Sequence, residues 1–186
     1  MEQETDEQLV LSIRTGNAEL FGVIIDRYEA KLTRYVRRFV QQPDDVADII
    51  QTIFIKAYVN LQSFDVSRVF NPWIYRIAHN ETVSFLKKKG NEKVSFLDFD
   101  TMLPHPFAKE VADKETLDAE LKQVLDTSLA TIPLKYREVL VLYFYEELSY
   151  QEIADVLRIP IATVGVRLRR AKEQLQKQVS NNHYTP

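Results

Sequence analysis

The stretch Leu148–Gln178, LSYQEIADVLRIPIATVGVRLRRAKEQLQKQ, decides the fold of the C-terminal half, because it predicts two helices joined by a tight turn. Ser149 followed three residues later by Glu152 is typical of a capping box at a helix start. Pro160 disfavours helix at the residue before it, so the first helix ends near Arg158. That turn position often needs a positive φ, which glycine adopts at lower cost than arginine.

The second helix, from about Ala162, has an apolar face and a basic face. Its apolar residues recur at helical spacing: Val164, Leu168, Ala171 and Leu175. The opposite face is predicted to hold Thr163, Val166, Arg169 and Arg170, with Arg167 at the border. A short helix, a tight turn and a second helix with a basic outer face are typical of a DNA-binding helix-turn-helix. The alternative is an ordinary helical hairpin whose basic face is solvated.

Composition limits the class of protein. The 186 residues are 45% hydrophobic and 27% charged, with only 4 glycines, which favours one packed helical domain or two small ones. The absence of cysteine excludes disulfides and thiolate metal sites, and the 3 histidines stand in unrelated settings. We therefore expect no cofactor, no small-molecule substrate and no enzyme activity.

The acidic N-terminus and the lack of an apolar run of about 20 residues predict a cytoplasmic protein. A net charge of −3 with local basic clusters indicates that DNA affinity does not act alone, and suggests a second, basic partner.

The first 42 residues predict two helices that break at Gly16–Asn17. The first carries a short apolar stripe and the second a long one, which we assign to a core: Leu9, Val10, Ile13, Phe21, Ile24, Ile25, Tyr28, Leu32, Tyr35, Val36 and Phe39.

The next helix, 44–61, carries an unusual outer face. Its buried face is predicted to hold Val46, Ile49, Ile50, Ile53, Phe54 and Ala57. The outer face holds Asp45, Asp48, Thr52, Ile55, Lys56 and Val59, with Gln51 at its edge. The helix dipole explains acids in the first turn. It does not explain two aliphatic residues on a polar face, a pattern typical of a protein–protein contact.

A loop, 63–71, precedes a helix in which Pro72 suits the first turn. Phe64 opens this loop with no apparent packing reason. The helix is predicted to turn Trp73, Ile77, Ala78 and Val83 inward and to present Arg76, Asn80, Lys87, Lys88 and Lys89. Basic residues with aromatics and an amide favour a single-strand binding surface, and a solvated lysine run is the alternative.

Residues 93–116, with Pro104 and Pro106, read as a linker, and helices follow over 117–131 and from Pro133. The sequence thus predicts an all-α fold of two small helical domains joined by a flexible linker. The domains are 1–92 and 117–179, the second containing the helix-turn-helix, and 180–186 is a tail.

Three segments in this order resemble a known family. They are DVADIIQTIFIKA (45–57), WIYRIAHN (73–80), and Ile132-Pro133 through Val139 followed by the helix-turn-helix. The chain resembles bacterial RNA polymerase sigma factors of the extracytoplasmic-function (ECF) group over nearly its whole length. The resemblance implies that 45–57 grips the clamp of core RNA polymerase, that 73–80 reads and melts the −10 element, and that the helix-turn-helix binds the −35 element. It also implies an anti-sigma factor as regulator.

The resemblance assigns roles to three sets of residues. The polymerase-binding set is Asp45, Asp48, Gln51, Thr52, Ile55 and Lys56. The −10 set is Phe64, Arg76, Asn80, Lys87 and Lys88. The −35 set is Thr163, Val166, Arg167, Arg169 and Arg170. The sequence departs from the family pattern at Thr52, Ser84, Arg158 and Gly165.

A second hypothesis is a repressor or activator that binds palindromic duplex DNA as a dimer, without polymerase. The face containing Asp48 and Ile55 would then be the dimer contact. A gel shift with and without core polymerase distinguishes the two hypotheses.

Overall fold

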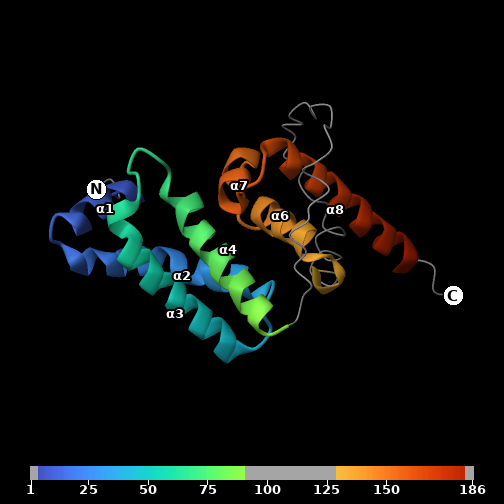
Figure 1. Cartoon of the computed structure of the whole chain (residues 1–186), viewed down its shortest axis with the longest axis horizontal. Coiled ribbons are helices and arrows are strands. Elements are labelled where there is room, and N and C mark those ends of the chain that lie inside the picture. Colours follow the sequence, from blue (N-terminus) through green and yellow to red (C-terminus); the bar gives the residue numbers. More distant parts are fainter. Residues whose placement is uncertain (1–3, 91–128, 183–186) are drawn as a thin grey trace. The chain divides into compact units, whose positions relative to one another are not determined.

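The computed structural model describes residues 4–90 and 129–182, and every regular element in these ranges is a helix. The all-α prediction is therefore confirmed. The chain divides into two compact units, Met1–Asn91 and Glu92–Pro186, each of which is described by itself (Figure 1). No helix in the described ranges is long and apolar enough to span a membrane.

The first unit begins with α1 (Asp6–Arg14), the 3-10 turn η1 (Ala18–Leu20) and α2 (Phe21–Arg37). Thr5 caps α1 in a reciprocal capping box with Gln8. Gly16, in the predicted break, has a φ of 124°, a conformation that only glycine adopts without strain. The apolar stripes of both helices are buried, except that Ile25 is half-buried.

Helix α3 (Pro43–Asn60), the 3-10 turn η2 (Leu61–Ser63) and α4 (Phe70–Lys88) complete this unit. Helix α3 packs against both α2 and α4 (Figure 1). All six residues predicted for the buried face of α3 are buried, because a strict helical stripe reports the core side directly.

The predicted buried face of α4 is partly wrong. Only Ala78 of the four predicted inward residues is buried, whereas Trp73, Ile77 and Val83 are half-buried. The core face of α4 is instead Phe70, Pro72, Ile74, Tyr75, Ala78, Thr82 and Leu86. Helix α4 begins two residues before Pro72, and seven of its first eleven residues are apolar or aromatic, so periodicity alone could not fix its rotation.

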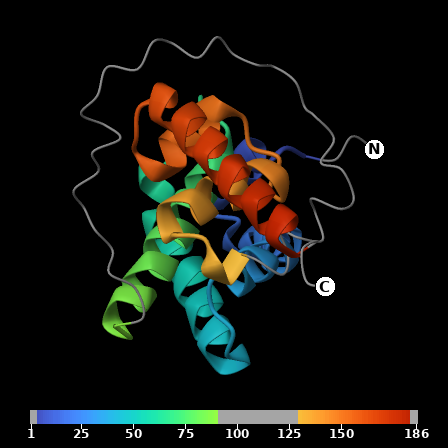
Figure 2. The ribbon, with the colours of Figure 1, turned by 90° about the vertical axis from the view of Figure 1, so that its right-hand side faces the viewer.

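The second unit contains η4 (Leu129–Thr131), α6 (Leu134–Phe144), α7 (Tyr150–Leu157) and α8 (Ile161–Asn182). Helix α8 packs on α6 and α7 (Figure 2). Its predicted stripe of Val164, Leu168, Ala171 and Leu175 is buried, which confirms that face as the core side. The predicted helix 117–131 falls outside the described residues except for η4, and so does the predicted linker.

Both ends of α7 have the predicted chemistry, the capping box at its start and the turn toward α8 at its end. The Ser149 backbone N–H donates to Glu152 Oε2 at 2.8 Å, and the Glu152 N–H donates to Ser149 Oγ at 3.3 Å. Arg158 adopts the left-handed conformation at φ 54° and ψ 47°, as its turn position predicts. The N–H groups of Arg158 and Ile159 both donate to the Ala154 carbonyl, so the turn closes α7 before α8 begins.

Candidate functional site

The outer face of α3 combines exposed aliphatic side chains with polar neighbours. Ile55 is 56% exposed and Val59 is 70% exposed. Asp48 and Gln51 are exposed on the same helix, and Thr52 is half-buried and donates from Oγ1 to the Asp48 carbonyl at 2.8 Å. We call Asp48, Gln51, Ile55 and Val59 the α3 strip. An exposed aliphatic pair with a polar rim is suited to bind another protein.

Two other predicted α3 residues are engaged inside the unit. Asp45 Oδ2 lies 2.5 Å from Lys89 Nζ, at the C-terminal end of α4. Lys56 Nζ lies 2.5 Å from Glu81 Oε1, near the middle of α4. Both pairs leave one partner about half exposed, so each contributes only about 0–1 kcal/mol and can open toward a partner.

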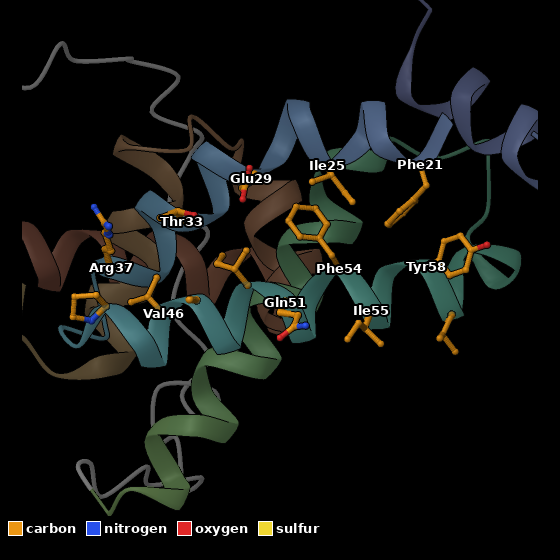
Figure 3. Close-up of a pocket in the computed structure, with 14 residues that line it drawn as sticks. Phe21, Ile25, Glu29, Thr33, Arg37, Val46, Gln51, Phe54, Ile55 and Tyr58 are labelled. Carbon is orange, nitrogen blue, oxygen red and sulfur yellow. The ribbon is translucent and has the colours of Figure 1, made fainter. Parts of the chain in front are cut away.

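A groove of about 620 Å³ lies between α2 and α3, beside the α3 strip. Figure 3 shows Phe21 and Ile25 of α2 pointing toward Phe54 and Tyr58 of α3 across this groove, with Gln51 and Ile55 on the outer side of α3. The Phe21 ring lies 5.0 Å from that of Tyr58, centroid to centroid, in an edge-on contact. The groove therefore extends the apolar surface of the α3 strip onto α2.

The outer surface of α4 carries the predicted polar residues. Asn80, Lys87 and Lys88 are exposed, and Arg76 is half-buried. Lys87 and Lys88 stand in the last turn of α4, where cations are favoured by the helix dipole, so their position alone does not require a ligand. The exposed amide of Asn80 offers both a donor and an acceptor.

The expectation that Phe64 lacks a packing reason is wrong. Its side chain is only 4% exposed. Its ring lies 5.4 Å from that of Phe70 and 5.2 Å from that of Trp73, and Phe70 lies 5.5 Å from Tyr28. This cluster joins residues that are far apart in sequence, so local periodicity could not reveal it. Phe64 supports the loop that follows it, and the exposed residues of that loop are Asp65, Ser67, Arg68 and Val69.

The helix-turn-helix face also differs from the prediction. Arg169 is exposed and lies 3.8 Å from Glu173, and Arg170 is half-buried. Thr163, Val166 and Arg167, predicted to face outward or to stand at the border, are all buried. The first two turns of α8 thus bury a second stripe beside Val164 and Leu168. A stripe of mixed threonine, valine and arginine gives no hydrophobic period, and an arginine stem packs readily on apolar surface. Burial lowers the pKa of Arg167 from its usual range, because desolvation disfavours the charged guanidinium.

Sequence reasoning missed three residues that the structure brings to these surfaces. Tyr58 is 48% exposed in the groove, and its helical spacing from Ile55 was a usable signal. Glu7 and Arg14 of α1 contact the loop before α4 through partners 63 and 47 residues away, for which the sequence offers no local signal.

Comparisons with known proteins match both units. The family model for Sigma-70 region 2 matches residues 24–92, and the model for Sigma-70, region 4 matches residues 122–175. The chain is 34% identical over 176 residues to the ECF RNA polymerase sigma factor SigW of Bacillus subtilis, covering 91% of this chain and 94% of that protein.

Two solved structures share the fold. CnrH, solved in complex with the cytosolic domain of CnrY, aligns at a TM-score of 0.69 and 23% identity, covering 96% of this chain and 99% of that chain. The sigma factor RpoE of Bartonella quintana, solved with the anti-sigma factor NepR, aligns at a TM-score of 0.61 and 24% identity, covering 86% and 96% of the respective chains.

Proposed function

This chain belongs to the family of ECF RNA polymerase sigma factors, and we propose that its two units divide the work of promoter recognition. In this proposal the first unit binds core RNA polymerase and captures the melted −10 strand, and the second unit binds the −35 duplex. In this proposal both units act by binding, and the chain itself performs no covalent chemistry. The proposed location is the cytoplasm, where core polymerase and DNA are found.

The α3 strip is the observation that carries the proposal. Ile55 and Val59 expose aliphatic carbon that a monomeric DNA-binding protein has no reason to present, and Asp48 places a negative charge beside them. Aliphatic anchors within a polar rim supply affinity, and the acid favours a basic partner surface. The adjoining groove, with Tyr58 at its edge, enlarges the area available for docking.

The −10 contact is assigned to α4 and to the loop that precedes it. Asn80 can read the edge of an extruded base, and Arg76, Lys87 and Lys88 attract the phosphates. Because Phe64 is buried, its proposed role becomes that of a support for the loop, and base capture passes to the exposed loop residues and Asn80.

The −35 contact is assigned to α8. Arg169 is exposed and Arg170 is half-buried, and the proposed contact with duplex DNA begins at these two residues. Thr163, Val166 and Arg167 are buried and can contact the −35 duplex only if they become exposed. The proposal therefore requires a change of exposure at these three residues. An anti-sigma factor that covers the α3 strip would block polymerase binding, and we propose this kind of regulator.

Run-off transcription with core polymerase on a genomic promoter pool tests the function. We expect transcripts that depend on both the chain and core polymerase, each starting at a fixed distance from a shared −35 and −10 pair. A gel shift should show specific duplex binding with polymerase and weak binding without it. Tight binding of a palindrome by the chain alone, with no stimulation of transcription, would favour the repressor hypothesis instead.

A further inference from the structure

Helix α1 contacts both ends of the loop that joins α3–η2 to α4. Arg14 donates from Nε to the Leu61 carbonyl at 3.0 Å and from Nη2 to the same oxygen at 2.5 Å. The same Nη2 also donates to the Phe64 carbonyl. Seven residues earlier on α1, Glu7 Oε1 accepts from the Phe70 backbone N–H at 2.8 Å. One helix therefore holds the first and the last residue that border the loop 65–69, in the region where α1 lies beside that loop (Figure 1).

The signs of the two charges match the helix ends that they meet. Leu61 is the C-cap residue of α3 and Phe64 is that of η2, and a cation is favoured at such helix ends. The Leu61 carbonyl also accepts the Phe64 N–H at 3.2 Å, so Arg14 adds to the bond that closes η2. Phe70 is the first residue of α4, where N–H groups lack partners and an anion is favoured. Val69, the N-cap residue of α4, has no side-chain acceptor to offer. Glu7 supplies that missing cap from another helix.

The loop between these two anchors is ordered at its base and open at its tip. Asp65 Oδ1 accepts from the Ser67 backbone N–H at 3.0 Å and from Ser67 Oγ at 2.7 Å, which closes a tight turn. Below it, the Phe64 and Phe70 rings meet edge-on at 5.4 Å. Arg68 and Val69 remain exposed above this base. The loop thus presents its tip from a position that α1 fixes.

We propose that Glu7 and Arg14 are positioning residues for promoter opening, because they cap the two helices that flank the loop 65–69 and hold that loop ready to receive the displaced −10 strand. The inference rests on the proposed −10 role of this loop and adds a role for α1, which that proposal does not use. A preformed loop binds single-stranded DNA without first losing conformational entropy, so α1 lowers the cost of capturing an extruded base.

Four variants of the full chain test the two caps. Arg14→Ala removes both carbonyl contacts, and Arg14→Lys keeps the cation but loses the planar fork. Glu7→Ala removes the acceptor, and Glu7→Gln restores a neutral one. Matched controls are Glu4→Ala in the segment before α1 and Arg34→Ala on α2, both of which remove an exposed charge.

The main measurement is the rate at which a 2-aminopurine in the −10 element becomes fluorescent with core polymerase. We expect the two alanine variants to slow opening about tenfold, since a hydrogen bond to a charged group is worth about that factor. Glu7→Gln and Arg14→Lys should recover part of the rate. Affinity for core polymerase and for the −35 duplex should stay unchanged, and a pre-melted template should restore activity. Hydrogen exchange should show faster exchange at 65–70 in the alanine variants and no change in the controls.

The outcomes separate this inference from the proposed function. If the parent chain opens promoters and the alanine variants open them at the same rate, the positioning role of α1 is wrong while the proposed function stands. If every variant loses both its affinity for polymerase and its ability to open the promoter, the role of these residues is a general structural one. That result would also overturn the inference. A parent chain that opens no promoter with core polymerase would overturn the proposed function, and this inference with it.

Discussion

The Nζ atom of Lys56 lies 2.5 Å from Oε1 of Glu81, so that an ion pair joins the outer face of α3 to α4. The Asp45–Lys89 pair joins the same two helices nearer their ends. Two of the charges assigned to polymerase binding are thus already compensated within the unit. The strongest candidates for direct contact are therefore the residues of the α3 strip, above all Asp48 and Ile55.

The first prediction concerns this strip. Asp48→Arg should repel a basic partner surface, and Ile55→Asp should bury a charge at the contact. We expect each change to weaken core polymerase binding by about 2 kcal/mol or more, which is roughly thirtyfold in affinity. Helicity should be unchanged, because both side chains are exposed. A competition assay against a labelled sigma factor measures the affinity.

Leu11→Asp is the matched control for the aliphatic change. Leu11 is 47% exposed on α1, outside the α3 strip, so the same loss of carbon and gain of charge should leave polymerase affinity intact. If Leu11→Asp and Ile55→Asp weaken binding equally, added negative charge is the cause and the strip is not the contact.

The second prediction separates Asn80 from Phe64. Asn80→Ala should keep stability, polymerase affinity and −35 binding but lose opening of the −10 element, because an exposed amide is removed without a cavity. Phe64→Ala should destabilise the first unit by about 3–5 kcal/mol, since it removes a ring that packs against both Phe70 and Trp73. Permanganate reactivity of thymines near −10 measures opening, and Trp73 fluorescence in urea measures stability.

Asn60→Ala removes another exposed asparagine, at the end of α3, and serves as the control for Asn80. It should leave opening unchanged. Full permanganate reactivity in the Asn80→Ala variant would show that this side chain does not read a melted base.

The third prediction concerns Arg170 on α8. If its guanidinium reads a base edge, Arg170→Ala should relax the preference at one −35 position by about 1–3 kcal/mol. A uniform loss on all sequences with a flatter salt dependence would identify a phosphate contact instead. Lys177→Ala, a charge change more than one turn further along α8, controls for net charge. Binding of a library of −35 duplexes at several salt concentrations distinguishes the two contacts.

Local rules predicted much of this fold, because the relevant signals lie within one helical turn. The Ser149–Glu152 capping box, the left-handed Arg158 and the six-residue buried face of α3 follow from spacings of three or four residues. The exposed pair Ile55 and Val59 was predictable for the same reason, since it breaks the period of its own helix.

The predictions failed where a side chain packs against another element of the fold, or where a buried stripe has mixed polarity. Phe64 is covered by Phe70 and Trp73, and no local pattern shows that a loop will fold back on the helix after it. The caps provided by Glu7 and Arg14 join residues 63 and 47 positions apart. Thr163 and Arg167 show the same limit, because a stripe of mixed polarity gives no apolar period to detect. Such contacts depend on tertiary packing, which overrides local preference.

The fourth prediction is a pH effect at the loop tip. The hydrogen bond from Ser67 Oγ, together with the bond from its backbone N–H, lowers the pKa of Asp65 below its ordinary value. A carboxyl whose folded-state pKa is depressed stabilises the fold above its unfolded pKa, and this stabilisation is lost as pH falls through the folded pKa. Ser67→Ala should therefore raise the pKa of Asp65 and loosen the turn at a higher pH than in the parent.

Carbon NMR of the Asp65 carboxyl measures this shift. Arg68→Gln is the control, because Arg68 lies farther away, at 3.7 Å, and is a weaker cause of the low pKa. A larger rise in Arg68→Gln than in Ser67→Ala would show that charge, not the hydrogen bonds of the turn, sets this pKa.

The last prediction concerns the turn of the helix-turn-helix. Arg158 holds a φ of 54°, where its Cβ crowds the backbone and costs about 1 kcal/mol relative to glycine. Relief of this strain in Arg158→Gly should stabilise the second unit by about 0.5–1 kcal/mol. The larger conformational entropy of glycine in the unfolded chain offsets part of this gain. Arg158→Ala keeps the Cβ and should bring no gain, so the pair of variants isolates backbone strain from the lost charge.

The only tryptophan of the chain, Trp73, stands in the first unit and does not report on this turn. Hydrogen exchange of the α7 amides under native conditions is therefore the measurement, and slower exchange in Arg158→Gly alone is the expected result. Equal slowing in both variants would mean that removal of the arginine charge, not relief of the left-handed conformation, stabilises the turn.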